Sequence, residues 1–238
     1  MRNESYDVVN AVKEALEIGK RAGVRVQLSH HKAYGKLNWG LSKETLGLVD
    51  EAVANGQKVT LDQYPFEASM THFNVLIPPR YFAGGISKVC EKLVDSEIRA
   101  RIKAEMLDKN AAFDNYYQNC GGWDRVFASV LPNTPEFSGM FVSDIAKRLD
   151  KDPFDTYLDL VIANNGAGTG IYFSMGEEDL CRIIKNPNAV VGSDGIVKAM
   201  NEKGHPRGWA TFPHAIFYFH KKKGLMPLEE IIRKMTSL

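Results

Sequence analysis

Three short segments of the chain carry side chains that could bind a metal ion or move a proton. SHHK offers His30, GSDG offers Asp194, and DQYPF lies between them in the sequence. Imidazole and carboxylate groups are ligands of catalytic zinc, which brings the pKa of its bound water towards neutrality. The alternative is that His30 is a hydrogen-bonded loop residue and Asp194 a turn or cap residue. The residue types therefore raise the hypothesis of a hydrolytic zinc site.

Other polar side chains near these segments could recognise a substrate. Arg207, in an HPR segment, has a guanidinium group shaped to bind a carboxylate through two hydrogen bonds, or it is a surface residue in a glycine-rich loop. Tyr64 could donate its hydroxyl to the same carboxylate, or pack at the mouth of the fold. His72, His214 and His220 have weaker claims, and the last two lie in an aromatic-rich helix where we expect structural roles.

The elements that must position these residues alternate between helix and strand. Apolar residues at helical spacing predict helices at 4–22 and 43–54, and short apolar runs after them predict strands at 24–28 and 59–61. This alternation is typical of parallel β/α units, in which function collects in the loops after the strands. SHHK and DQYPF lie in two such loops, and GSDG follows a third predicted strand at 189–191. We therefore predict that 24–30, 58–63 and 189–194 are adjacent parallel strands whose carboxyl ends converge.

The stretch from about 67 to 168 interrupts this alternation, and we interpret it as an insertion or lid over the mouth of the sheet. We assign helices to it but no strands. The remaining predicted helices lie at 94–108, 142–149, 155–163, 176–184, 212–223 and 227–236.

Composition and charge argue against several classes of protein. The chain has 238 residues, 44% apolar and 25% charged, which fits one large globular domain or one and a half ordinary ones. Its 30 basic and 29 acidic residues give no electrostatic reason to expect a nucleic acid or a membrane as partner. No apolar run approaches the ~20 residues that span a bilayer, and the N-terminus lacks the apolar core of a signal peptide. Cys90, Cys120 and Cys181 are too few and too scattered for a disulfide framework, so we expect a reducing, cytoplasmic location.

Six segments together resemble the D-aminoacylase (N-acyl-D-amino-acid deacylase) family of the amidohydrolase superfamily. In order, they are MRNE, VQLSHHKAYGKLNWG, VTLDQYPFEAS, GSDG, GHPRGWATFPHA and LEEIIRKMTSL. The resemblance implies an α/β fold, with residues 1–238 as the C-terminal portion of a (β/α)8 TIM-type barrel and the insertion as its lid. It also implies zinc-dependent hydrolysis of small N-acyl-D-amino acids to a carboxylate and a free D-amino acid.

The resemblance also implies roles by position. His30 and Asp194 match metal-binding positions, and Asp194 would take the proton of the metal-bound water and pass it to the leaving amine. Lys32, Tyr64 and Arg207 match positions that line the substrate site. Of these, Arg207 and Tyr64 suit the carboxylate of the D-amino acid.

The chain departs from the family pattern in its ligands. The first-strand H-x-H or H-x-D motif, a cysteine ligand and a histidine directly before MRNE are not in this sequence, nor is the segment that follows TSL in the family. We therefore expect a truncated barrel with weakly bound or no zinc, low activity alone, and an open sheet edge that could self-associate or take a missing N-terminal half. Phe66, Met70 and His214 stand where members have Tyr, Ser and Arg.

Two alternatives stay open at this point. One is another amidohydrolase that cleaves cyclic amides, of the hydantoinase or dihydroorotase kind. The other is a catalytically inactive remnant of a barrel. The HPR segment and the insertion favour the deacylase.

Overall fold

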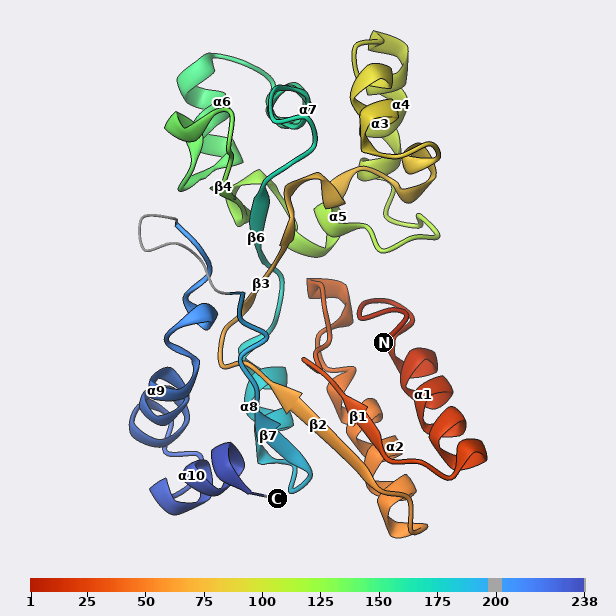
Figure 1. Cartoon of the computed structure of the whole chain (residues 1–238), viewed down its shortest axis with the longest axis vertical. Helices are drawn as coiled ribbons and strands as arrows, with labels where there is room; N and C mark the ends of the chain where they lie inside the picture. The colour runs from red at the N-terminus through yellow and green to blue at the C-terminus, as the bar shows by residue number, and fades with distance from the viewer. Residues whose placement is uncertain (197–202, 238) are drawn as a thin grey trace. The chain divides into compact units, whose positions relative to one another are not determined.

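The computed structural model describes residues 1–196 and 203–237, whose elements are labelled in Figure 1. The chain divides into two compact units. The first unit combines Met1–Glu67, Met175–Lys198 and Pro206–Leu238, and the second combines Ala68–Ser174 and Ala199–His205. Both units contain helices and a sheet, so the fold is mixed α/β. The insertion predicted at about 67–168 corresponds to most of the second unit, and its role as a lid stays a prediction.

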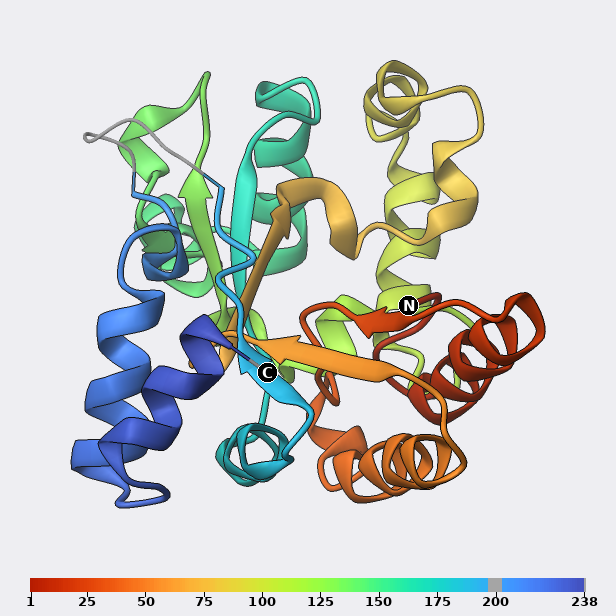
Figure 2. The same ribbon diagram turned by 60° about the horizontal axis from the view of Figure 1, so that its bottom comes forward.

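The first unit is built on a parallel sheet of three strands. β1 (Val26–Leu28), β2 (Val59–Gln63) and β7 (Ala189–Val191) lie in the order β1-β2-β7. Both pairings are parallel, with Val26 opposite Val59. Figure 2 shows β2 (orange) between β1 (red) and β7 (blue). The prediction of three adjacent parallel strands is therefore confirmed.

Three helices pack their apolar faces against this sheet. They are α1 (Val8–Ala22), α2 (Ser42–Ala54) and α8 (Glu177–Lys185). The helices and strands share one core, made of Val12, Leu16, Leu28, Leu46, Val49, Val59, Leu61, Ile183 and Ala189. Each buried branched side chain contributes about 1.5–3 kcal/mol relative to exposure, so this core accounts for much of the stability of the unit.

The C-terminal helices of the first unit pack on β7. α9 (Thr211–Ala215) continues into a wider, π-helical segment, η7 (Ile216–Lys222), and α10 (Leu228–Thr236) follows. Their core contains Tyr218, Phe219 and Ile231 together with Val191 of β7. The predicted helix at 212–223 is thus present, but its second half is wound more widely than the periodicity indicated. Short 3-10 turns lie at Lys36–Asn38 and Pro206–Gly208.

The second unit contains an antiparallel sheet that the sequence analysis did not predict. Its order is β3-β6-β4-β5, with β3 (Ala68–His72), β6 (Thr169–Phe173), β4 (Val126–Val130) and β5 (Met140–Phe141). The assignment of helices alone to this stretch was wrong. These strands are short, and a segment such as TGIYF shows no regular alternation of apolar and polar residues.

The helices of the second unit agree better with the sequence. They are α3 (Ile86–Lys92), α4 (Ser96–Leu107), α5 (Tyr116–Cys120), α6 (Val142–Leu149) and α7 (Pro153–Ala163). Short 3-10 turns connect them at Phe73–Leu76, Pro79–Phe82, Trp123–Arg125 and Pro135–Phe137. Across the described parts of both units, no helix has the length and apolar character needed to cross a membrane.

Candidate active site at the strand ends

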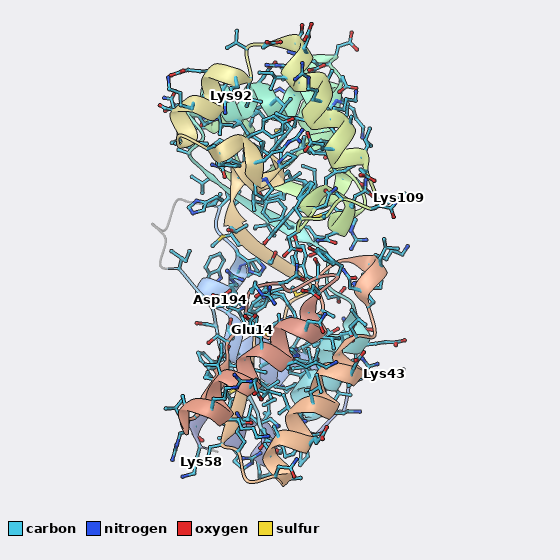
Figure 3. All side chains as sticks on the ribbon, turned by 90° about the vertical axis from the view of Figure 1, so that its right-hand side faces the viewer. Glu14, Lys43, Lys58, Lys92, Lys109 and Asp194 are labelled. Atoms are coloured by element: carbon cyan, nitrogen blue, oxygen red, sulfur yellow. The ribbon has the colours of Figure 1, made fainter. Side chains whose placement is uncertain are left out.

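The structure brings all five predicted site residues together at the carboxyl ends of the parallel sheet. His30 and Lys32 follow β1, Tyr64 follows β2, and Asp194, labelled in Figure 3, follows β7. Arg207 reaches the same edge from the 3-10 turn after it. Neighbouring parallel strands end on the same side of a sheet, so the helix–strand alternation explains why His30, Tyr64 and Asp194 gather there.

The backbone of both candidate metal ligands is left-handed. His30 has a φ of 43° and Asp194 a φ of 46°. The other described non-glycine residues with positive φ, Asp150 and Asn165, lie at the ends of helices, where this conformation is ordinary. A left-handed residue with a side chain costs about 1–2 kcal/mol. The fold therefore keeps two strained turns at the positions where chemistry was predicted, which is a common property of functional sites.

The turn after β1 is fixed by the side chain of Asp62 on β2. The His30 N–H donates to Asp62 Oδ1 at 2.8 Å, and the His31 N–H donates to the Asp62 carbonyl at 2.8 Å. Gln27 of β1 donates from Nε2 to Asp62 Oδ2 at 2.6 Å. One carboxylate thus ties His30 to the neighbouring strand.

A half-buried acid, Glu4, contacts both polar side chains of the β1 loop. Its Oε1 lies 2.9 Å from His30 Nδ1, and its Oε2 lies 2.7 Å from Lys32 Nζ. Burial raises the pKa of the Glu4 carboxyl, but the His30 hydrogen bond and the Lys32 charge outweigh it and lower the pKa to about 2. The sequence analysis quoted Glu4 within MRNE but gave it no role. Its place in that segment was the only available signal.

Two cations lie near the Tyr64 ring. The Arg207 guanidinium is 4.7 Å from the centre of the Tyr64 ring, and Lys32 Nζ is 5.9 Å from it. The Tyr64 hydroxyl contacts Met175 Sδ at 3.9 Å. Burial lowers the pKa of Lys32, while the charges of Glu4 and Asp194 oppose that effect. The predicted contact of Tyr64 with a substrate carboxylate stays a prediction.

Arg207 forms an ion pair with Asp194. Its NH1 lies 2.8 Å from Asp194 Oδ2, and its side chain is only 4% exposed, against 35% for Asp194. The sequence analysis assigned Arg207 to a substrate carboxylate and did not foresee this contact. A buried guanidinium beside a half-exposed carboxylate fixes the orientation of that carboxylate.

The other histidines have protein partners. His31 is buried, its Nε2 lies 2.9 Å from Thr45 Oγ1, and burial lowers its pKa to about 4, so it is neutral at pH 7. The His214 ring stacks on Phe66 at 4.6 Å. His220 Nδ1 lies 3.1 Å from the Met226 carbonyl. These contacts agree with the structural roles expected for His214 and His220.

His72 and His205 belong to the second unit. His72 ends β3, and His205 is buried with its Nε2 2.9 Å from the Ala68 carbonyl. Neither contributes to the set of residues at the strand ends of the first unit.

His30 and Asp194 are suited to form part of a metal site. The Nδ1 of His30 meets a carboxylate, which is the usual arrangement behind a metal-bound histidine. Within residues 1–196 and 203–237, however, no group of three or more His, Cys, Asp or Glu side chains is placed to hold a metal ion. His30 and Asp194 could therefore supply two ligands, and a tight zinc site needs three or four.

The chain is similar along its whole length to known deacylases. It is 32% identical to D-aminoacylase from Alcaligenes xylosoxydans xylosoxydans, and 30% and 31% identical to the N-acyl-D-aspartate and N-acyl-D-glutamate deacylases of that organism. Each match covers 100% of this chain but only 38–39% of the relative. The chain thus spans about two fifths of the length of the curated relatives it matches. No family model matches the chain.

Solved structures give the same relationship. The chain resembles N-acyl-D-glutamate deacylase from Bordetella bronchiseptica, solved with zinc and a phosphonate mimic of the tetrahedral intermediate, with a TM-score of 0.71 and 30% identity. That match covers 99% of this chain and 40% of the other. A D-aminoacylase described as defining a novel subset of amidohydrolases matches with a TM-score of 0.69 and 31% identity over 99% of this chain and 39% of that one.

In sequence and in fold, the chain is therefore similar to enzymes described as amidohydrolases. Its relatives are D-aminoacylase and the N-acyl-D-amino-acid deacylases, and it matches their C-terminal part. The resemblance identified from the sequence is confirmed.

Proposed function

We propose that this chain forms part of a metal-dependent hydrolase that cleaves N-acyl-D-amino acids to a carboxylate and a free D-amino acid. The observation that carries the proposal is the convergence of His30, Lys32, Tyr64, Asp194 and Arg207 at one sheet edge. The similarity of the whole of this chain to part of D-aminoacylase supports the proposal. We interpret the three parallel strands as part of a (β/α)8 barrel, because the candidate site residues follow the carboxyl ends of these strands, where such barrels have their active sites.

The residues of this chain would share the reaction as follows. A divalent metal, held in part by His30 and Asp194, would lower the pKa of a bound water. The Asp194 carboxylate would accept the proton of the attacking water and return it to the leaving amine. Arg207 holds Oδ2 of that carboxylate at 2.8 Å, so that Oδ1 is the oxygen oriented for proton transfer.

The positive charges beside Tyr64 favour a substrate with a carboxylate. Lys32 and Arg207 lie 5.9 Å and 4.7 Å from the centre of the Tyr64 ring, and each is largely buried. A buried cation strengthens its interaction with an incoming anion because less water screens it. We therefore infer that the α-carboxylate of the N-acyl-D-amino acid is bound on this side of Tyr64.

The test uses the complete protein that contains this chain, loaded with zinc. It should hydrolyse N-acetyl-D-amino acids and leave the L-enantiomers unreacted, and Asp194→Asn should reduce kcat by at least about 100-fold. Glu17→Gln is the control, since Glu17 is an exposed acid of α1 that pairs with Arg21. Undiminished turnover in Asp194→Asn would remove Asp194 from the mechanism.

Arg207→Lys separates two roles for the arginine. If Arg207 binds the substrate carboxylate, kcat/KM for the free acid should fall about ten- to a hundredfold, while the corresponding carboxamide, a poor substrate, should be nearly indifferent. If Arg207 serves only to hold Asp194, kcat/KM should fall by the same factor for the free acid and for the carboxamide. Equal losses would withdraw Arg207 from substrate binding and leave it as the partner of Asp194.

Four finer expectations accompany this proposal. The substrate is a small molecule, as the names of the relatives indicate for those enzymes. Self-association through the open sheet edge and a cytoplasmic location stay predictions. Zinc is the metal we propose, because the N-acyl-D-glutamate deacylase structure contains it.

A further inference from the structure

One face of the parallel sheet carries a row of hydrogen-bonded polar side chains. Val59 and Leu61 of β2 are buried in the core with the helices, so the alternate residues Thr60 and Asp62 point to the opposite face. Gln27 of β1 lies opposite Thr60 in the sheet register, and the Thr60 hydroxyl donates to its Oε1. Gln27 in turn donates from Nε2 to Asp62 Oδ2 at 2.6 Å. This contact leaves the other carboxylate oxygen, Oδ1, for the turn after β1.

Asp62 holds that turn through both its side chain and its main chain. Its Oδ1 accepts the His30 N–H at 2.8 Å, and its carbonyl accepts the His31 N–H at 2.8 Å. His30 has a φ of 43°, a conformation that costs free energy in a residue with a side chain. A hydrogen bond to a carboxylate is one of the stronger kinds and opposes this cost. The Asp62 side chain therefore helps to keep His30 in a conformation that its backbone disfavours.

The same side chain packs against the segment that leads to Asp194. Gly192 directly follows β7, and a methyl group added to it would lie 2.7 Å from Asp62 Oδ1 and 3.0 Å from Asp62 Cγ. Asp194, two residues further on, is left-handed as well, with a φ of 46°. Asp62 thus contacts the turn of His30 and the start of the turn of Asp194, and a residue without a side chain at position 192 leaves room for it.

We propose that Asp62 is a positioning residue that sets both turns of the candidate site as a hydrogen-bond acceptor and packing partner, and that its negative charge is not required. The inference rests on the proposed function only for its effect on turnover. The alternative for an acid at this sheet edge is a direct chemical role, as a metal ligand or a proton carrier. Both carboxylate oxygens already accept hydrogen bonds from the protein, at 2.8 and 2.6 Å, which favours the positioning role.

Two substitutions of similar shape separate these roles. In Asp62→Asn, the remaining oxygen can accept the His30 N–H while the new NH2 group faces Gln27. The Gln27 side chain is exposed, so its amide can turn over, accept from that NH2 group and donate to Thr60 Oγ1. Every contact of the row then survives without a charge. Asp62→Leu offers no acceptor, so the His30 N–H loses its partner.

The first readout needs neither metal nor substrate. In protein labelled with ¹⁵N-histidine, a strong NOE between the amide and α protons of one residue marks a left-handed backbone, because a positive φ brings these protons together. The His30 signal is assigned by its loss in His30→Gln. We expect a strong NOE for His30 in the wild type and in Asp62→Asn, and an ordinary one in Asp62→Leu. A strong NOE in folded Asp62→Leu would overturn the inference, and so would a weak one in the wild type or in folded Asp62→Asn.

Turnover by the complete protein loaded with zinc gives the second readout. Asp62→Leu should lower kcat for an N-acetyl-D-amino acid about 10- to 100-fold, while Asp62→Asn should stay within about threefold of the wild type. If Asp62→Asn loses as much as Asp62→Leu, the charge is needed, and the inference is overturned. A wild type that does not hydrolyse the substrate contradicts the proposed function, and the NOE comparison then still decides the role of Asp62.

A pair of glycine variants tests the contact with the second turn. Gly192→Ala should lower kcat, because its methyl group would displace the Asp62 side chain or the turn of Asp194. Gly47→Ala is the control, since no atom lies within 4 Å of its added methyl group, and it should leave kcat unchanged. Equal kcat in the two variants would overturn the claim that the turn of Asp194 depends on its packing against Asp62.

Discussion

The buried carboxylate of Asp179 in α8 is the polar group whose loss should cost this fold most. Its side chain is 3% exposed and pairs with the Arg182 guanidinium at 2.6 Å. It also accepts hydrogen bonds from the Gly40 N–H at 2.8 Å and from the Ser42 hydroxyl. Gly40 and Ser42 precede and begin α2, so this one carboxylate joins α8 to the start of α2. We consider the substitution Asp179→Ala.

The expected loss can be worked from these contacts. Removing one partner of a buried ion pair costs about 3–5 kcal/mol, because the remaining charge and donors lose their acceptor. The Arg182 side chain is 25% exposed and so regains some water, which places the estimate near the lower limit. A loss of ~3 kcal/mol raises the unfolded-to-folded ratio by about two orders of magnitude.

The neighbouring residue provides a matched control. Glu178 lies beside Asp179 in α8 and 3.9 Å from the same guanidinium, but its side chain is 93% exposed. Exposed ion pairs contribute ~0–1 kcal/mol, so Glu178→Ala should change stability little. Urea unfolding followed by circular dichroism measures the loss of stability in Asp179→Ala and in Glu178→Ala, provided that the m-value is unchanged. Arg182→Ala and the Asp179→Ala/Arg182→Ala double variant complete a double-mutant cycle. The reasoning is refuted if Asp179→Ala costs no more than Glu178→Ala.

Four other substitutions should change stability. Gly47→Ala within α2 should stabilise the fold by about 0.5–1 kcal/mol, because no atom lies within 4 Å of the added methyl group. Gly19→Ala within α1 should instead cost about 1–3 kcal/mol, because its methyl group would lie 2.1 Å from Val26 Cγ2; thermal melts of both variants check the contrast. Glu4→Gln should lower the free energy of unfolding by ~3 kcal/mol above pH 4.5, because the pKa of the Glu4 carboxyl is about 2 in the folded state and 4.5 ordinarily. The difference in stability from wild type should shrink as the pH falls towards 2. A pH-independent difference in urea unfolding would contradict this prediction. Lys234→Met should cost about 2 kcal/mol in the same assay, because it removes a buried donor that lies 2.7 and 3.0 Å from two backbone carbonyls next to β7.

The strand-end framework could be predicted because its signals are local. Each of the three parallel strands is a short apolar run that follows a helix, and a glycine marks the end of the helix α1. Gly23 adopts the left-handed conformation there, with a φ of 66°. Polar residues follow each run, so the topology of β/α units places His30, Tyr64 and Asp194 at one edge without any knowledge of tertiary contacts.

The second unit could not be predicted in the same way. β3 pairs with β6 across about a hundred residues, and β4 pairs with β6 through a register irregularity at Ala128. Pairings of this kind depend on which strand surfaces meet in space, and the sequence of each strand alone does not encode them. The helices α6 and α7 were predicted because their apolar spacing is a local feature, although α7 begins at Pro153 and not at the predicted residue 155.

The details of the site were also beyond the sequence. Asp194 and Arg207 were each identified as candidates, but their ion pair was not, because the twelve residues between them do not indicate where the guanidinium group lies in space. Glu4 lies before the first helix and contacts His30 only through the fold. The sequence thus indicated candidate groups for the site, while their partners needed the structure.

The side chain of Asp62 makes the site dependent on the register of the sheet. Asp62 accepts hydrogen bonds from Gln27 and from the His30 N–H, both on the neighbouring strand or just after it. A slip of one residue between β1 and β2 would turn every side chain to the opposite face and carry Asp62 away from His30. A chain folded in the wrong register would therefore lack the His30 turn. A ligand that binds at His30 would bind only the correctly paired sheet. It would therefore stabilise that pairing relative to the shifted one, and the fraction of correctly folded chain would rise with the concentration of the ligand.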